Sequence, residues 1–259
     1  MNELRFTESI ARLAGKHMLR ERATLVVSMK GKNDLVTNVD KSTEALIIGE
    51  IQKLYPQDQI LGEESGTDEG GDHGSRRWVI DPIDGTQNFA QGIPLFCVSI
   101  ALQIDGKSVV GCIYDPNRDE LFSAALGEGA FLNGEPMQVS EKEVLDESLV
   151  VTGFPLTRTD EFRWTIKQYF AMTDVSRGIR RLGSAALDLA YIACGRLDLF
   201  WEYGLKPWDT AAGYLLVQEA GGVVTDLEGG EFLAESPNVL ATNGKIHAEG
   251  IEVLANALR

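Results

Sequence analysis

The stretch WVIDPIDGTQNF, residues 78–89, places two aspartates three positions apart at the end of an apolar run. Pro82 and Gly85 stand beside Asp81 and Asp84, and Asp-Pro and Asp-Gly pairs are common in turns. This segment alone leaves two interpretations open: an ordinary turn after a buried strand, or a pair of carboxylates that binds a cation. The residues around it decide between them.

The overall composition is that of a folded, acidic protein. The chain has 259 residues, of which 44% are hydrophobic and 24% are charged, and its formal net charge is −15. This length suits one large domain or two modest domains that share a core. Because no basic excess offsets phosphate charge, we expect no non-specific binding to nucleic acid or to an anionic membrane.

From this sequence we expect no targeting segment. Its first residues, MNELRFTESIARL, are polar and of mixed charge, unlike a signal peptide, and no apolar run is long enough to cross a bilayer. Cys97, Cys112 and Cys194 lie far apart in apolar stretches, so we expect them to be buried and reduced in a cytoplasmic protein. A catalytic thiol would need a nearby histidine, and the pattern offers none.

Up to about residue 145 the pattern predicts helices followed by mostly antiparallel strands. Apolar spacing indicates helices over 3–20 and 40–56, single strands at 24–29, 59–65 and 76–83, and paired hairpins over 95–125. The run SGTDEGGDHGS at 65–75 is rich in glycine and acidic residues, which predicts a mobile surface loop.

Beyond residue 145 helices and strands alternate. The expected strands are 148–153, 197–203, 222–226 and 238–242, and the expected helices are 160–172, 184–194, 208–220 and 245–257. Elements interleaved in this way favour sheets covered by layers of helices. Because no linker separates the two patterns, we divide the chain into an N-terminal α+β half, 1–145, and a C-terminal α/β half, 146–259, packed tightly as one functional unit.

Several further acidic residues stand where a strand ends or a helix begins, namely Glu63, Glu64, Asp40 and Asp209. Each one taken singly fits a helix cap or a solvated side chain. Converging in a pocket without basic partners, they would repel one another and raise one another's pKa, which a fold tolerates when cations neutralise them. Because no Cys or His accompanies them, the ligand set favours Mg²⁺ over Zn²⁺.

The residues after Asp84 suggest a partner for such a cation. The segment DGTQN offers the backbone N–H groups of Gly85 and Thr86 just before a stretch able to begin a helix, and free N–H groups at a helix start bind phosphate. Gly85 permits close approach because it has no side chain. The chain lacks the GxxxxGK[ST] pattern of P-loop proteins. These features together indicate metal-assisted phosphoryl chemistry, and they favour hydrolysis of a phosphate ester over transfer of the phosphoryl group to another substrate.

At this point the motifs resemble those of a known family. GEES at 62–65, DPIDGTQNF at 81–89 and WDTAAGYLLVQEAGG at 208–222 resemble, in order and spacing, the signatures of the inositol monophosphatase family of Mg²⁺-dependent, lithium-sensitive phosphatases. The likeness covers nearly the whole chain and looks greatest for the bacterial inositol-1-monophosphatases. Asn88 after DGTQ matches the inositol-phosphatase form, since related bisphosphate nucleotidases commonly carry Glu there.

The resemblance implies a fold, an assembly and a set of metal ligands. The fold is a layered αβαβα sandwich of the α+β class, the sugar-phosphatase-like fold, with a homodimer and a site between the halves. The implied cofactor is Mg²⁺, two or three ions per chain. The implied ligands are Glu63, Asp81 and the carbonyl of Ile83 for the first ion, and Asp81, Asp84 and Asp209 for the second, with a third ion near Glu63.

The resemblance also implies the remaining roles. The catalytic set is Thr86 and Asp40, which position and deprotonate a water, together with Glu63. The substrate-binding set is Asp84, Gly85, Thr86, Gly183, Ser184, Ala185, Glu202 and Asp209. Glu64 and a mobile-loop lysine, Lys30 or in its place Lys32, support the ligands from behind. Asp188 and Asp198 are interpreted as surface or capping residues.

The expected activity is hydrolysis of inositol 1-phosphate and related polyol phosphates to inositol and phosphate by metal-activated water. Two alternatives share the metal core and differ around 153–185 and 202: fructose-1,6-bisphosphatase and histidinol-phosphate phosphatase. A second phosphate, as in fructose 1,6-bisphosphate, would be bound by Arg180, Arg181 and Lys206, although such residues more commonly form surface salt bridges. An alternative of a different class is an interaction or regulatory protein with incidental phosphatase activity.

Overall fold

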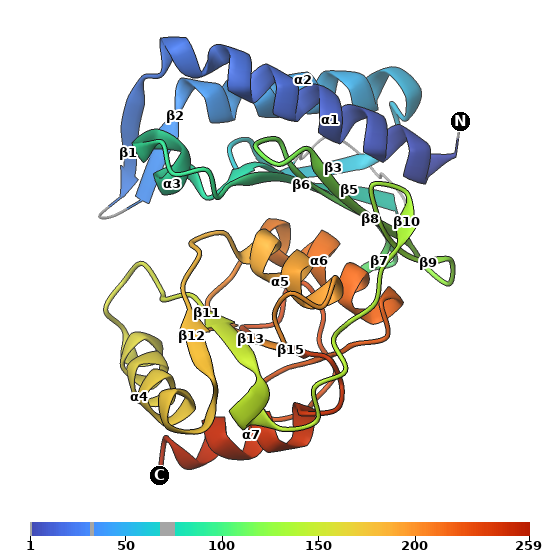
Figure 1. The fold of residues 1–259 in the computed structure, drawn as a ribbon. Helices are drawn as coiled ribbons and strands as arrows, with labels where there is room; N and C mark the ends of the chain where they lie inside the picture. Colours follow the sequence, from blue (N-terminus) through green and yellow to red (C-terminus); the bar gives the residue numbers. More distant parts are fainter. Residues whose placement is uncertain (1, 32–33, 68–75) are drawn as a thin grey trace.

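The structure is a computed structural model that describes residues 2–31, 34–67 and 76–259. Five layers are stacked from one end of the molecule to the other (Figure 1): two helices, a large sheet, two helices, a small sheet and two helices. The helices, in layer order, are α1 (Glu3–Glu21) and α2 (Asn38–Leu54), α5 (Ala185–Ala193) and α6 (Pro207–Glu219), and α4 (Asp160–Val175) and α7 (His247–Asn256). This arrangement confirms the predicted αβαβα sandwich.

The large sheet is almost entirely antiparallel, as the first part of the sequence predicts. Only β3 and β5 run parallel among its described strands. Its order is β10 (Glu135–Pro136), β9 (Gly129–Leu132), β8 (Glu120–Ala125), β7 (Lys107–Asp115), β6 (Cys97–Ile104), β5 (Arg76–Asp84), β3 (Gln59–Gly62) and β4 (Gly66–Thr67). The hairpins expected over 95–125 are β6, β7 and β8.

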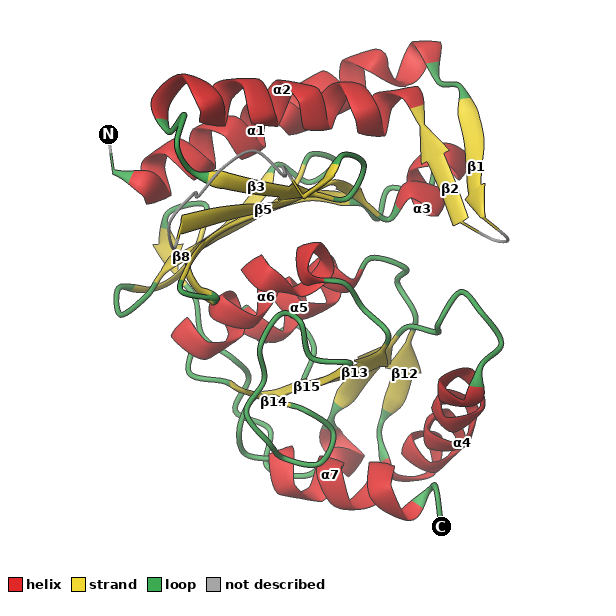
Figure 2. Ribbon diagram, turned by 180° about the vertical axis from the view of Figure 1, so that it is seen from behind, coloured by secondary structure: helices red, strands yellow, loops and turns green. Residues whose placement is uncertain are grey.

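The small sheet is mixed. β11 runs parallel to both of its neighbours, whereas β15 pairs antiparallel with β13 and β14. Its order is β12 (Gly178–Arg180), β11 (Leu149–Thr152), β13 (Leu199–Tyr203), β15 (Asn238–Thr242) and β14 (Val223–Thr225). The sequence pattern predicts every one of these strands except the short edge strand β12. Figure 2 shows from behind how α5 and α6 lie between the two sheets.

The remaining described elements are a hairpin, a short helix and two 3₁₀ turns: β1 (Val27–Gly31) with β2 (Asp34–Thr37), α3 (Thr86–Gln91), and the turns Arg22–Thr24 and Leu145–Glu147. The strand expected at 24–29 therefore begins later, at Val27, and Thr24 still belongs to the 3₁₀ turn. Of the loop expected at 65–75, residues 68–75 lie outside the described residues, as does Lys32.

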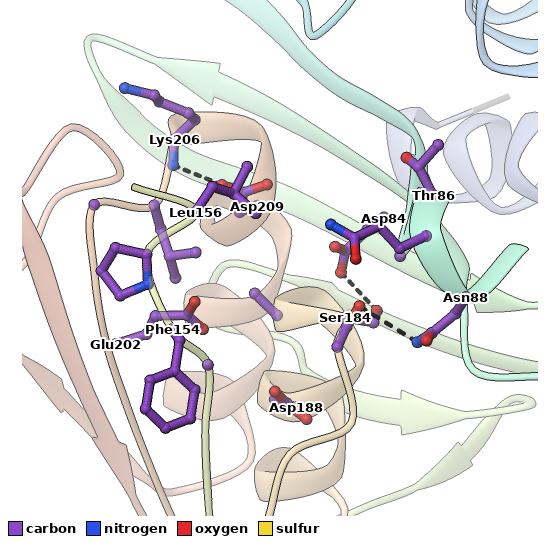
Figure 3. A pocket seen from close by; sticks show the side chains of 18 of the residues that line it. Asp84, Thr86, Asn88, Phe154, Leu156, Ser184, Asp188, Glu202, Lys206 and Asp209 are labelled. Carbon is purple, nitrogen blue, oxygen red and sulfur yellow. Dashed lines mark hydrogen bonds between the residues drawn. The ribbon is translucent and has the colours of Figure 1, made fainter. Parts of the chain in front are cut away.

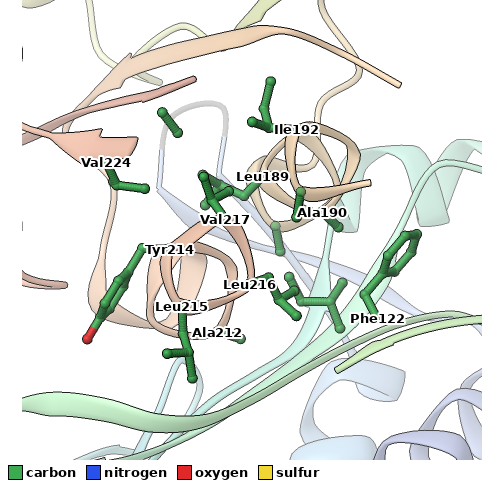
Figure 4. Packing of buried hydrophobic residues seen from close by; sticks show 14 of the residues in the cluster. Phe122, Leu189, Ala190, Ile192, Ala212, Tyr214, Leu215, Leu216, Val217 and Val224 are labelled. Carbon is green, nitrogen blue, oxygen red and sulfur yellow. The ribbon is translucent and has the colours of Figure 1, made fainter. Parts of the chain in front are cut away.

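Hydrophobic packing joins the N-terminal and C-terminal parts of the chain. Phe122 of β8, Leu189 of α5 and Leu216 of α6 are fully buried in one cluster, which Figure 4 shows at the contact of the helices with the large sheet. Further clusters lie between this sheet and α1–α2, and below the small sheet. The division at residue 145 stays a prediction. The free Cys97 and Cys112 are buried as expected, but Cys194 is only half-buried.

Two helices begin in a way that concerns the acidic residues. Thr37 caps α2 by accepting from the backbone N–H of Asp40 at 3.2 Å, and Asp40 Oδ2 accepts from the Thr37 N–H at 2.8 Å. The helix therefore starts before the predicted residue 40, and Asp40 lies in its first turn. At α6, Asp209 Oδ2 accepts from the Lys206 N–H at 2.6 Å. Each aspartate thus uses one carboxylate oxygen to cap its helix, and its other oxygen remains available for a different contact.

Gly49 offers a test of helix α2. It lies in the helix interior, and a Cβ added there would meet no heavy atom within 4 Å. Because alanine loses less backbone entropy on folding, Gly49→Ala should raise the free energy of unfolding by about 0.5–1 kcal/mol in urea denaturation. Gly15→Ala in α1 is the contrasting variant, since its Cβ would lie 2.5 Å from the Tyr114 ring. A loss of stability in Gly49→Ala would contradict the description of α2.

Candidate active site

A β-bulge in β5 brings Asp81 and Asp84 to the same face of the large sheet. Asp81 pairs with Ser99 and Asp84 with Cys97, so β5 spans this stretch with one residue more than β6. In a regular strand, residues three apart face opposite sides, and the extra residue restores the same side. Ile83 is accordingly buried on the other face, against the helices of the first layer. The opening segment is therefore the bulged end of a strand.

Asp84 connects the large sheet to helix α5. Its Oδ2 accepts from the Ser184 hydroxyl at 2.6 Å and from the Ala186 backbone N–H at 2.6 Å, and the Cys97 thiol lies 3.9 Å away. A carboxylate is favoured at a helix N-terminus, where unpaired N–H groups point outward. Burial raises the pKa of Asp84, while these donors act to lower it. One oxygen of Asp84 is thus fixed by α5.

Four carboxylates converge beside this point. Oxygen atoms of Asp81, Asp84 and Asp209 all lie within 4.8 Å of one another, and Glu63 contacts Asp81. Glu63 reaches this place because β3 ends beside β5, with the Glu63 N–H donating to the Ile80 carbonyl at 3.1 Å. Burial and then repulsion from the neighbouring carboxylates raise the pKa of Asp81 and Asp209 well above their ordinary range.

Lys30 and Glu44 flank the cluster on the side of Glu63. Lys30 Nζ lies 3.0 Å from Glu63 Oε1 and also pairs with Glu64. Burial acts to lower the pKa of Lys30, but the two carboxylates outweigh it and raise that pKa. From α2, the buried Glu44 accepts from the backbone N–H groups of Glu64 and Ser65 at 2.9 and 2.8 Å. It thereby fixes the turn that carries Glu63, a role its place in a helix pattern did not reveal.

Thr86 lies between Asp40 and Ile83. Its hydroxyl is 3.2 Å from Asp40 Oδ1 and 3.0 Å from the Ile83 carbonyl oxygen. Burial raises the pKa of Asp40, while hydrogen bonds from Thr37 and Thr86 act to lower it. Asp40 is fully buried, so its polar contacts here come from the protein. The expected partnership of Thr86 with Asp40 is present in the geometry.

Backbone conformation at Gly85 and the side chain of Asn88 shape the entrance of α3. Gly85 has φ = +95°, and a Cβ there would lie 2.9 Å from the Leu95 carbonyl oxygen, so only glycine fits. Asn88 Nδ2 donates to the carbonyls of Leu95 at 2.7 Å and Leu182 at 2.8 Å. A carboxylate in place of Asn88 could not donate to either carbonyl, which explains why this position needs an amide side chain.

A cavity of about 400 Å³ adjoins the carboxylates, a volume typical of small-molecule sites. Figure 3 shows Asp84, Thr86 and Asn88 along one side, Glu202 and Phe154 along another, and Ser184 between them. The predicted substrate residues from both halves therefore meet in one place. The substrate-binding residues that line it are Asp84, Gly85, Thr86, Gly183, Ser184, Ala185, Glu202 and Asp209. Glu63, predicted as a catalytic residue and metal ligand, also lines it, and Lys30, Arg181 and Lys206 contribute positive charge.

The far side of the cavity carries two buried carboxyl groups. Burial, followed by repulsion from Asp209 and Asp84, raises the pKa of Glu202 to about 8. Asp188 also lines the cavity and is buried, and its Oδ1 has no hydrogen-bond partner among the described residues. Its interpretation as a surface or capping residue is wrong, because α5 is enclosed between two sheets. Asp198 is likewise buried, where it accepts from the Leu149 N–H at 2.7 Å.

The raised pKa values predict how stability depends on pH without metal. In the folded protein the pKa is about 7 for Glu63 and about 8 for Glu202, so each carboxyl group keeps its proton up to that pH. In the unfolded chain the same group loses its proton near the ordinary glutamate pKa of about 4.3. Such a group stabilises the fold at low pH and loses this effect as pH rises through the folded value. In EDTA, the Tm should therefore fall from pH 6 to pH 9.

The variant Glu202→Gln should flatten the part of this slope below about pH 8, where the folded protein holds the Glu202 proton and the unfolded chain does not. The exposed Glu135→Gln should leave the slope unchanged. Saturating Mg²⁺ should reduce the whole dependence, since a bound cation favours the deprotonated carboxylates. A Tm that stays constant or rises between pH 6 and pH 9 in EDTA would contradict the electrostatics described here.

Comparison with known proteins gives a consistent result over the whole chain. The family model described as "Inositol monophosphatase family" matches residues 2–259. Nus factor SuhB of Escherichia coli (strain K12) is 47% identical over 239 residues, which cover 91% of this chain and 89% of that protein. The inositol-1-monophosphatase of Mesorhizobium japonicum is 45% identical over 234 residues, which cover 89% of this chain and 87% of that protein.

Solved structures agree with the sequences. The extragenic suppressor protein suhB from Bartonella henselae superimposes with a TM-score of 0.92 at 42% identity, covering 96% of this chain and 97% of that one. The Thermotoga maritima IMPase superimposes with a TM-score of 0.91 at 38% identity, covering 100% of this chain and 98% of that one. These findings confirm the resemblance seen in the motifs, and this chain belongs to the inositol monophosphatase family.

Proposed function

We propose that this chain is a Mg²⁺-dependent phosphomonoesterase that hydrolyses inositol 1-phosphate and related polyol phosphates. The observation that carries the proposal is the cluster of Asp81, Asp84 and Asp209 oxygens within 4.8 Å, beside a cavity that Glu202 lines at its far side. The family and the printed name of the Mesorhizobium japonicum relative support the reaction and the substrate class.

The donor set fits a hard cation. All groups offered are oxygens, and in Asp84 and Asp209 one oxygen is held by backbone N–H groups, which leaves the other for a metal. Glu63, Asp81 and the Ile83 carbonyl would hold one Mg²⁺, and Asp81, Asp84 and Asp209 a second, with a third near Glu63. Bound there, Mg²⁺ would lower the pKa of water and offset the charge of the phosphate.

Thr86 and Asp40 are assigned to the proton of the attacking water. Because Asp40 Oδ2 is held by Thr37, its Oδ1 stays directed at the Thr86 hydroxyl, 3.2 Å away. Thr86 Oγ1 would accept a hydrogen bond from the water and pass its own proton toward Asp40. Glu63 is the third residue of the proposed catalytic set. Lys30 and Glu64 support Glu63 from behind.

Backbone groups and the far side of the cavity are assigned to the substrate. The N–H groups of Gly85 and Thr86 would donate to phosphate oxygens, and in the present structure the Gly85 N–H interacts with the Asp84 carboxylate. The turn Gly183–Ala185 lines the cavity between phosphate and alcohol, and Glu202 would contact a hydroxyl of the leaving group.

A panel of substrates tests the assignment within the family. Inositol 1-phosphate should give the highest kcat/KM among inositol 1-phosphate, fructose 1,6-bisphosphate and histidinol phosphate. Of the cations considered for a second phosphate, Arg181 and Lys206 line the cavity, so fructose 1,6-bisphosphate is the sharpest rival. If either rival gives a higher kcat/KM, the inositol assignment is wrong while the metal site remains.

The variant Asp84→Asn tests the metal site. It keeps the size of the side chain but removes one charge, so we expect activity to fall chiefly through weaker Mg²⁺ binding. The Mg²⁺ concentration for half-maximal activity should rise at least about tenfold, equivalent to about 1.4 kcal/mol, and the Mg²⁺-induced rise in Tm should shrink. The exposed Asp146→Asn is the matched control. Near-normal turnover of Asp84→Asn at low Mg²⁺ would remove Asp84 from the site.

A second candidate function is interaction with another protein. It is favoured by one observation: the relatives at 47% identity are named Nus factors. The test is affinity capture with wild-type protein and Asp84→Asn as bait, followed by mass spectrometry. Under this candidate a defined partner is retained by both baits. If no partner is shared by the two baits, this candidate is rejected.

The proposal also keeps the homodimer and the lithium sensitivity that the resemblance implies, and the cytoplasmic location expected from the sequence. Light scattering in solution should give twice the 28.3 kDa chain mass, and Li⁺ should inhibit the Mg²⁺-dependent reaction. Across the part of the chain that the structure describes, no helix combines the length and apolar character needed to cross a membrane.

A further inference from the structure

Gly153 and Glu202 stand at the ends of neighbouring strands beside the cavity. β11 and β13 are parallel, with Val151 paired to Phe200 and Thr152 to Trp201, so Gly153 follows in register beside Glu202. The Thr152 hydroxyl donates to the Trp201 carbonyl at 2.6 Å and fastens the two strand ends together. Residues beside each other on parallel strands direct their side chains to the same face.

The carboxylate of Glu202 occupies the place where a side chain at position 153 would begin. A Cβ built on Gly153 would lie 2.1 Å from both carboxylate oxygens of Glu202 and 2.3 Å from its Cδ. Carbon and oxygen atoms that are not bonded do not approach so closely, so any other residue here would displace the carboxylate. The Gly153 backbone N–H also interacts with this carboxylate and acts to lower its pKa against the effect of burial.

The backbone conformation does not require glycine at position 153. The backbone at Gly153 is not among the left-handed conformations of the described residues, so alanine is compatible with the local chain path. The three heavy atoms nearest to a new Cβ belong to the end of the Glu202 side chain, which can rotate, rather than to backbone. An alanine should therefore leave the fold intact and move one carboxylate.

Glu202 depends on this arrangement because its other neighbours repel it. Asp209 and Asp84 raise its pKa through their charges, and the buried Asp188 lies on the same side of the cavity. Arg181 is the cation whose charge acts in the opposite direction, and its side chain is exposed. The space and the N–H group at Gly153 thus keep a carboxylate in a place that electrostatics alone disfavours.

We propose that Gly153 is a positioning residue for substrate selection: by having no side chain it holds the Glu202 carboxylate where a hydroxyl of the leaving group binds. This inference rests on the proposed phosphatase function. It assigns the selectivity for hydroxyl-rich phosphate esters, over esters without hydroxyl groups, to the pair of residues rather than to Glu202 alone.

The test is a double-mutant cycle of Gly153→Ala and Glu202→Ala with Mg²⁺, measured on inositol 1-phosphate and on 4-nitrophenyl phosphate. Losing a hydrogen bond to a charged group should raise KM for inositol 1-phosphate about tenfold or more in Gly153→Ala. KM for 4-nitrophenyl phosphate, which offers no hydroxyl, should stay within about twofold. In the Glu202→Ala background, Gly153→Ala should have no further effect, because the displaced group is gone.

Two further measurements separate positioning from general damage. Gly178→Ala on the neighbouring strand β12 is the matched control, since its Cβ would come no closer than 3.4 Å to any heavy atom, and it should leave both substrates unchanged. A crystal structure of Gly153→Ala should show the Glu202 carboxylate displaced. Equal losses on both substrates, or an equal loss in the Glu202→Ala background, would overturn the proposal.

The cycle also distinguishes this inference from the proposed function. If wild-type protein hydrolyses neither ester in Mg²⁺, the phosphatase function fails, and the crystal structure of Gly153→Ala still decides whether Gly153 positions Glu202. If wild-type protein hydrolyses both esters with equal KM, the function stands and the inference about selectivity fails.

Discussion

The site depends on the extra residue that β5 carries between Asp81 and Asp84. Without the bulge, one of these carboxylates would point into the apolar cluster under α1 and α2, where Ile80 and Ile83 are buried. With it, both point toward α5 and α6, and both meet residues from the other half of the chain. One irregularity in a strand therefore turns a local turn motif into a contact between two distant parts of the sequence.

Three carboxylates at the site contribute both to the fold and to the site. Asp40 caps α2 with one oxygen and directs the other at the Thr86 hydroxyl. Asp209 caps α6, and Asp84 accepts from the N-terminus of α5, each with one oxygen, so that the other oxygen is left for the site. Helix N-terminal N–H groups partly offset charges that otherwise repel one another. Because these hydrogen bonds hold the side chains in one orientation, the carboxylates stay close together despite their mutual repulsion.

Much of the fold was predictable because strand and helix periods are local. The hairpins β6 to β8 and the buried helices α5 and α6 follow from their apolar spacing, and the motif residues identify the cluster. What could not be predicted depends on contacts between distant segments. Glu44 looks like a helix-surface residue until the turn after β3 is packed on it, and Asp188 looks exposed because a sequence does not show that α5 is enclosed on both sides.

The same reasoning explains why glycine matters at both ends of the cavity. At Gly85 the requirement is conformational, since φ is +95° and the Leu95 carbonyl fills the space of a Cβ. At Gly153 the backbone is ordinary, and the requirement comes from the carboxylate of a neighbouring strand. A substitution at the first position would disturb the chain path itself, whereas one at the second would displace a single functional group. The two glycines thus separate the part of the site that depends on folding from the part that, under the proposed function, selects the leaving alcohol.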